Sequence, residues 1–215
     1  RLSSYDHRAA AVVSSVACFN PNNTIFTQSS PRFKQMFMYM AGYDDEAKFD
    51  VEVAQPMTVR GYLDKVKCPT LLVTGEFDPL CPLEEAVEAY GDLKVPKEMW
   101  IMENQYHPLW GIPNLGGMDC HDYVMDWLQG LFSGKRVPKK SGRIAYVGEH
   151  GDGPWSACEW EPPVKAGQPY FCVGPTGKAG RGPGCDPPAS CRPGGIAPAV
   201  RGDDRGARHA HPGCA

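Results

Sequence analysis

The sequence lacks several features that would place it in a class at once. No apolar run approaches the roughly 20 residues that a membrane-spanning helix needs. The nine cysteines form no Cys-x-x-Cys pair, and their odd number argues against a disulfide framework. Neither sign of charge dominates, because the formal net charge is −3, so nothing suggests a nucleic-acid partner or a membrane surface. These absences favour a soluble protein, and 215 residues suffice for one globular domain.

The beginning of the chain also lacks familiar signals. Residues 1–10, "RLSSYDHRAA", contain neither an initiator methionine nor the apolar segment of a signal peptide. The chain therefore reads as beginning inside a longer protein, with these residues as the end of a helix and its exit loop. We expect a cytoplasmic protein.

Apolar runs and amphipathic segments alternate through the first 140 residues. Strands are predicted at 9–19, 70–76 and 97–103, the first of them buried on both faces. Helices are predicted at 31–42, 83–93 and 120–132. Strands that alternate with helices indicate crossover units, so the fold class is α/β with a parallel sheet.

The helix predicted at 31–42 carries an apolar stripe. Proline at position 31 suits its first turn and glycine at position 42 suits its end. Phe33, Met36, Phe37 and Met40 have the spacing i, i+3, i+4, i+7, which places them on one face. The favoured interpretation is a helix that packs on a core. The alternative is a cap helix that lines a substrate pocket.

The composition changes after about residue 140. Residues 141–173 still contain aromatic side chains and are interpreted as an irregular extension packed on the domain. Residues 174–215 are rich in Gly, Pro and Arg and contain no aromatic residue. Such a segment cannot bury enough apolar surface to order itself, so we predict a disordered tail. The same composition arises when GC-rich DNA is read in a wrong frame.

Two residues that follow predicted strands are candidates for chemistry. Asp78 lies in "LLVTGEFDPLCP", just after the strand at 70–76, and His107 lies in "IMENQYHPLWG", after the strand at 97–103. Alone, the aspartate would more often be a turn residue or helix cap, and the histidine a solvated side chain. At the carboxyl ends of successive parallel strands, however, the two can meet. A carboxylate that accepts the imidazole Nδ1–H orients the ring for proton transfer.

With these residues in place, the chain resembles the C-terminal half of an α/β-hydrolase. The likeness rests on "CPTLLVTGEFDPLCP", "LEEAVEAYGDL", "KEMWIMENQYHPLWG" and "YVMDWLQGLF". The resemblance implies that Asp78 is the acid and His107 the histidine of a catalytic triad. The first 60 residues, with "YDHRAAAVVSSVACF" and "PRFKQMFMYMAGYDDEAKF", are similar to a subgroup with an added helical domain. That subgroup contains 2,6-dihydroxypseudooxynicotine hydrolase, fungal polyketide-shortening hydrolases and fermentation–respiration-switch esterases.

The resemblance also implies a division of the chain and a reaction. Residues 1–140 would be a partial α/β-hydrolase domain with a cap-like helical segment at about 20–60. The substrate would be a small molecule, either an ester or a ketone whose C–C bond is cleaved, with no cofactor and no metal. Homodimer formation by the full-length protein is a further expectation.

One element of the family pattern is absent from the sequence. The nucleophilic serine of these enzymes lies in G-x-S-x-G, between a strand and a helix and ahead of the acid and the histidine. No such motif occurs in the 215 residues. The resemblance places it upstream of Arg1, so this chain would be a fragment. The alternative is a catalytically inactive truncated product or binding remnant of such an enzyme.

Overall fold

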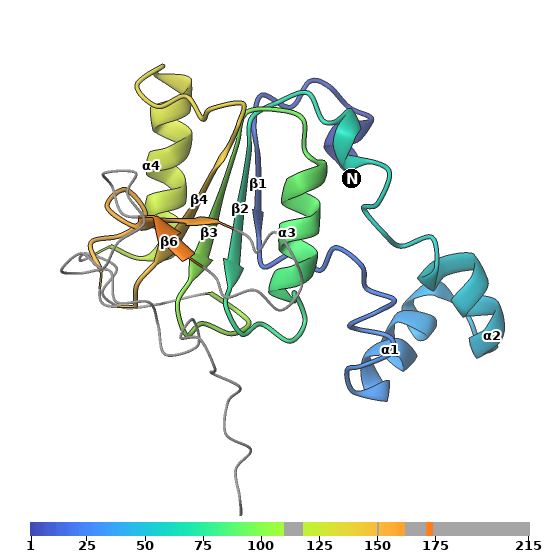
Figure 1. Ribbon diagram of the computed structural model, residues 1–215. Helices are drawn as coiled ribbons and strands as arrows, with labels where there is room; N and C mark the ends of the chain where they lie inside the picture. Colours follow the sequence, from blue (N-terminus) through green and yellow to red (C-terminus); the bar gives the residue numbers. More distant parts are fainter. Residues whose placement is uncertain (110–117, 150, 162–170, 174–215) are drawn as a thin grey trace, which may run out of the picture.

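The computed structural model describes residues 1–109, 118–149, 151–161 and 171–173, and its centre is one mixed sheet (Figure 1). The strands lie in the order in which they occur in the chain. They are β1 (Val12–Ser15), β2 (Thr70–Gly75), β3 (Lys97–Met102), β4 (Arg143–Val147), β5 (Cys158–Glu161) and β6 (Phe171–Val173). The first four strands are parallel, and β5 and β6 are added antiparallel. The expected α/β class is therefore confirmed.

Helices cover both faces of the parallel strands. Helix α3 (Leu83–Asp92) packs on one face through Ala86, Ala89 and Tyr90. Helix α4 (Cys120–Phe132) packs on the other face through Tyr123 and Trp127. Successive strand residues point to opposite faces, so each strand serves both cores. In β3, Met99 and Ile101 belong to the α3 side, and Trp100 and Met102 to the α4 side.

The connections from β2 to β3 and from β3 to β4 have opposite hands. Strands β2, β3 and β4 follow one another across the sheet, whereas α3 and α4 lie on opposite faces. A crossover between parallel strands is right-handed in about 98% of cases. One of the two connections is therefore of the rare left-handed kind.

Strand β1 is shorter and more exposed than the sequence predicts. It covers four residues, pairs with β2 alone within the described chain, and has partly exposed side chains along its length. The prediction of a strand buried on both faces is wrong, because a strand at the edge of a sheet lacks a neighbour that would cover it.

The segment between β1 and β2 folds beside the sheet (Figure 1). It contains α1 (Pro31–Ala41), α2 (Glu46–Phe49) with a π-helical turn at Asp50–Ala54, and a 3-10 turn at Leu63–Lys65. A small core forms around Phe26 and Phe49.

Helix α1 has the predicted bounds but not the predicted burial. The Ser30 side chain caps its beginning, and Gly42 closes it at a positive φ of 75°. Of the four residues in the stripe, Phe37 packs on Phe26, with ring centroids 5.1 Å apart. Phe33, Met36 and Met40 are 36%, 45% and 63% exposed. The interpretation of the whole stripe as a core face is therefore wrong, because helical spacing shows that a face is apolar but not what covers it.

The prediction of an irregular extension at 141–173 is also wrong for part of that range. Residues 143–147 form β4 and residues 158–161 form β5. The β4 sequence "RIAYV" is a short buried strand between two glycines, a pattern that periodicity alone does not separate from a loop. Cys158 is disulfide-bonded, which the cysteine pattern did not predict. The tail predicted as disordered, 174–215, lies outside the described residues.

None of the helices in the described part of the chain has the length and apolar character that crossing a bilayer requires.

Candidate active site

Asp78 lies in the loop that joins β2 to α3. Its side chain is fully buried, and its Oδ1 accepts hydrogen bonds from the backbone N–H groups of Leu80 (2.8 Å) and Cys81 (3.1 Å). These bonds form a turn of the kind that aspartate favours, so Asp78 is a turn residue as well as a candidate for chemistry. They occupy one carboxylate oxygen, fix the side chain, and leave Oδ2 to interact with another group.

His107 supplies that group from the loop after β3. Its Nδ1 lies 3.0 Å from Asp78 Oδ2, and its side chain is 34% exposed. An ionised carboxylate only accepts hydrogen bonds, so the imidazole carries its proton on Nδ1 in this arrangement. Nε2 is then a hydrogen-bond acceptor. The structure thus brings together the two residues that the sequence singled out.

The close approach of the two loops depends on the last residue of β2. Gly75 packs against the backbone of Gln105 and Tyr106, and a Cβ atom at this position would lie 2.6 Å from Gln105 O. The Phe77 N–H donates to the same carbonyl at 3.0 Å. Any larger residue at position 75 would push the histidine loop away from β2.

A polar brace that sequence reasoning missed holds the histidine loop. Glu76 Oε2 accepts from the Asn104 backbone N–H (3.1 Å) and from the Tyr146 hydroxyl (2.8 Å). Asn104 has a positive φ of 55°, a conformation in which asparagine is enriched, so a turn there was readable from the sequence. Tyr146 was not, because it comes from β4, which was not predicted. The brace connects three neighbouring strands at the edge where Asp78 and His107 meet.

Cys81 is the third polar side chain beside the pair. Ligand atoms of Asp78, Cys81 and His107 all lie within 4.8 Å of one another, and this set of residue types can hold zinc. The thiol, however, donates to the Val16 carbonyl at 2.9 Å, and burial raises its pKa above the ordinary value. Val16 itself has a φ of 44°, unusual for a β-branched residue, and turns β1 toward this loop. The cluster is therefore held by hydrogen bonds that keep the thiol protonated.

A pocket of about 410 Å³ adjoins the aspartate, within the size range of small-molecule sites. Its wall combines aromatic and acidic side chains, including Phe77, Tyr146, Trp160 and Glu84. None of the four stripe residues of α1 lines this pocket.

Comparison with known proteins gives a fold likeness and no family. No protein-family model matches the chain, and no curated protein matches its sequence. Among solved structures, the chain is similar to 2,6-dihydroxy-pseudo-oxynicotine hydrolase, with 19% sequence identity and a TM-score of 0.49. The similarity covers 64% of this chain, which spans 38% of the length of that enzyme. At this identity the likeness concerns the arrangement of strands and helices alone.

Proposed function

We propose that this chain carries the acid and the histidine of a Ser-His-Asp hydrolase of the α/β-hydrolase type. The observation that supports the proposal most directly is the 3.0 Å contact between His107 Nδ1 and Asp78 Oδ2. The pair lies where the carboxyl ends of β2 and β3 adjoin, which is where catalytic groups gather in parallel sheets. The buried carboxylate and the half-buried ring also have the exposures that these two roles require.

The roles follow from the two faces of the imidazole. His107 Nε2 would take the proton of a serine hydroxyl as that serine attacks a carbonyl carbon, and would then return the proton to the leaving group. Asp78 would hold the ring in its tautomer and stabilise the imidazolium that forms. Asp78 is fixed by its two backbone bonds, so the ring orientation costs little at the moment of reaction.

The serine and the oxyanion-hole amides are not among these residues, since no G-x-S-x-G motif occurs in the sequence. In this proposal they belong to a segment that precedes Arg1 in the intact enzyme. The substrate would be a small organic ester, or a ketone whose C–C bond is cleaved. The pocket beside Asp78 has aromatic side chains in its wall, but His107 is not among the residues that line it, so the support for this substrate class comes from the Asp78–His107 pair and not from the pocket. This chemistry requires no cofactor.

The hydrogen bond is testable in the 215-residue chain itself. A proton held between Nδ1 and a carboxylate gives a far-downfield ¹H NMR signal, which should disappear in Asp78→Ala. Asp119→Ala is the matched control, because Asp119 Oδ1 lies 3.9 Å from Nδ1 of a different histidine, His121, which is beyond hydrogen-bond range. Loss of the signal in the control, or its survival in Asp78→Ala, would contradict the pairing.

The catalytic role is testable in a longer chain that includes an upstream G-x-S-x-G. There, His107→Ala should lower kcat for an activated ester by about 10³-fold or more. The same variant should not change hydrolysis by the 215-residue chain, for which we expect no turnover above background. Robust hydrolysis by the short chain would show that the nucleophile lies within it.

A second function, a catalytically inactive binding remnant, is favoured by one observation. The absence of the serine motif leaves the histidine without a recognisable group to activate. If the DNA upstream of Arg1 contains no in-frame G-x-S-x-G, this second function replaces the first.

A further inference from the structure

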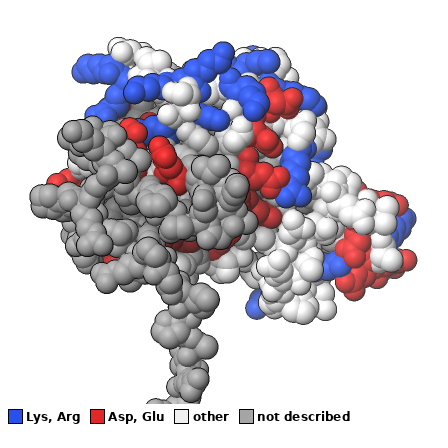
Figure 2. Space-filling view, viewed as in Figure 1, with Lys and Arg blue, Asp and Glu red and all other residues white. Residues whose placement is uncertain are grey.

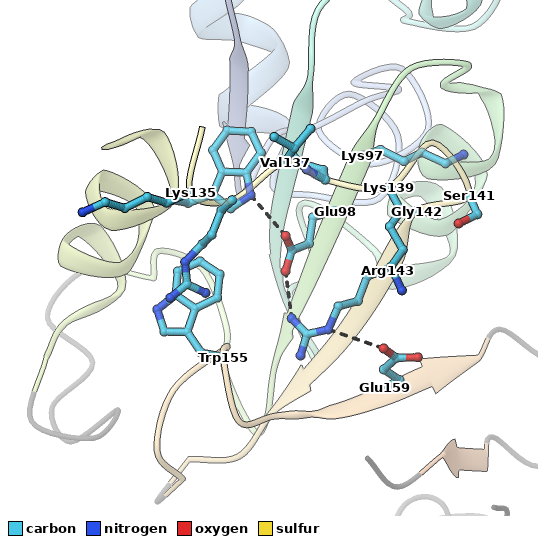
Figure 3. A pocket seen from close by; sticks show the side chains of 13 residues that line it. Lys97, Glu98, Lys135, Val137, Lys139, Ser141, Gly142, Arg143, Trp155 and Glu159 are labelled. Atoms are coloured by element: carbon cyan, nitrogen blue, oxygen red, sulfur yellow. Dashed lines mark hydrogen bonds and ion pairs between the residues drawn. The ribbon is translucent and has the colours of Figure 1, made fainter. Parts of the chain in front are cut away.

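A second pocket lies at the opposite end of the sheet, where β3 and β4 begin (Figure 3). Lys97 and Glu98 from the start of β3 and Arg143 from the start of β4 form its floor. The connection from α4 to β4, residues 133–142, forms one wall, and Trp155 forms another. The pocket has a volume of about 500 Å³.

Glu98 makes the floor rigid. Its carboxylate accepts from the indole N–H groups of Trp100 (3.0 Å) and Trp127 (3.1 Å) and pairs with Arg143 at 2.8 Å. Arg143 also donates to the carbonyls of residues 154 and 157. Figure 3 shows Glu98 and Arg143 facing each other in the middle of the pocket. This negative charge is thus neutralised inside the protein and does not repel an anion.

Three of the five basic residues that line the pocket have structural partners. Arg143 is held as described, and Lys97 donates to the carbonyls of Tyr90 and Leu93 at the end of α3. The guanidinium of Arg136 lies 3.5 Å from the ring centre of Trp155. These contacts order the wall and the floor around the cavity.

The other two, Lys135 and Lys139, are exposed, and their ammonium groups pair with no carboxylate in the part of the chain that the structure describes. Five basic and two acidic residues line the pocket, an excess of three positive charges in a chain whose formal charge is −3. Figure 2 shows Lys and Arg gathered along the upper edge, the end at which the strands begin in Figure 1. The pocket therefore lies within a basic edge of the molecule.

We propose that this pocket binds a small molecule that carries phosphate groups, with Lys139 as one ligand and Lys135 as the other once its side chain turns inward from the outward direction drawn in Figure 3. Lysine ammonium groups bind phosphate as point charges, and a polyvalent anion matches the excess charge. The concave shape, with apolar side chains such as Val137 beside the cations, favours a small ligand over the flat surface of a polyanion. This site is independent of the Asp78–His107 pair.

Pyrophosphate is the probe for this proposal, and isothermal titration of the 215-residue chain is the measurement. We expect one saturable site that weakens several-fold between 0.05 and 0.5 M NaCl, because partly exposed charges are screened. The double variant Lys135→Gln/Lys139→Gln should raise Kd roughly ten-fold or more. The control Arg32→Gln/Lys48→Gln removes two positive charges from α1 and α2, which lie beside the sheet, and should change Kd less than two-fold.

The alternatives give different results. Equal weakening in both double variants would mean that net charge alone attracts the probe, and would overturn the site. Binding to phosphatidylglycerol vesicles or to duplex DNA that pyrophosphate does not displace would assign the surface to a membrane or a nucleic acid instead. Vesicle binding that pyrophosphate displaces would support the site and identify a lipid headgroup as the source of the phosphate.

Discussion

Gly75→Ala tests the link between the end of β2 and the position of His107. The added Cβ would lie 2.6 Å from Gln105 O, 2.9 Å from Gln105 C and 3.2 Å from Tyr106 O. Ordinary contact begins near 3.4 Å, so relief requires a movement of roughly 0.8 Å. All three contacted atoms belong to the backbone and cannot rotate away as a side chain would. The histidine loop must therefore move as a unit.

This movement has two measurable consequences. Overpacking of this kind destabilises a protein by roughly 1–3 kcal/mol. A shift of the same size at His107 would stretch its contact with Asp78, now 3.0 Å, to about 3.8 Å, beyond hydrogen-bond range. In an active enzyme, a misplacement of about 1 Å lowers the rate by roughly 10²-fold.

Urea denaturation and the downfield imidazole signal together measure both effects in the 215-residue chain. Gly91→Ala is the control, because Gly91 lies inside α3 and a Cβ there meets nothing within 4 Å. That substitution should be neutral or stabilise by up to about 1 kcal/mol, since alanine favours the helix. If Gly75→Ala is as stable as Gly91→Ala and keeps the imidazole signal, the close packing of the histidine loop on β2 is refuted.

Two further substitutions address burial. Glu98→Ala should lower the free energy of unfolding by roughly 3–5 kcal/mol in urea denaturation, because two indoles and the guanidinium of Arg143 lose their acceptor. The control is Glu159→Ala, which removes an exposed partner 3.8 Å from the same guanidinium. It should lower the free energy of unfolding by less than about 1 kcal/mol. Burial raises the pKa of Cys120 to about 11, so the unfolded chain loses this proton from about pH 8.5 upward while the folded chain retains it. Stability should therefore fall as pH rises through this range, and less steeply in Cys120→Ala; equal slopes in urea denaturation from pH 7 to 10 would contradict the shift.

The parts of the fold that the sequence predicted are those with a strong local signal. Strands β2 and β3 are apolar runs bounded by turn residues, and α4 is an amphipathic segment with an apolar face. Asp78 and His107 could be paired because parallel strands deliver their following residues to one edge. Local pattern and topology were sufficient for this pair.

The parts that the sequence did not predict depend on tertiary context. Strand β4 joins the sheet beside β3 although α4 lies on the face opposite α3, and the handedness rule disfavours one of these two connections. The hydrogen bond from Tyr146 to Glu76 was not predicted either, because Tyr146 belongs to β4. The exposure of Met40 reflects which surfaces happen to face α1, and no periodicity encodes that.

The Asp78–His107 pair and the basic pocket can be tested separately, because they lie at opposite ends of the sheet and salt screens the charges of one from the other. Strand β3 begins at Lys97, in the basic pocket, and ends at Met102, five residues before His107. At about 3.3 Å per residue the strand is roughly 17 Å long, about twice the screening length at physiological salt. Effects at sites this far apart that share no partner add to within about 0.5 kcal/mol. Gly75→Ala combined with Lys135→Gln/Lys139→Gln should therefore show the sum of the separate changes in unfolding free energy, and the lysine substitutions should leave the imidazole signal unchanged. A larger deviation would mean that β3 transmits a structural change from one end to the other, and the two proposed sites would then have to be treated as one coupled system.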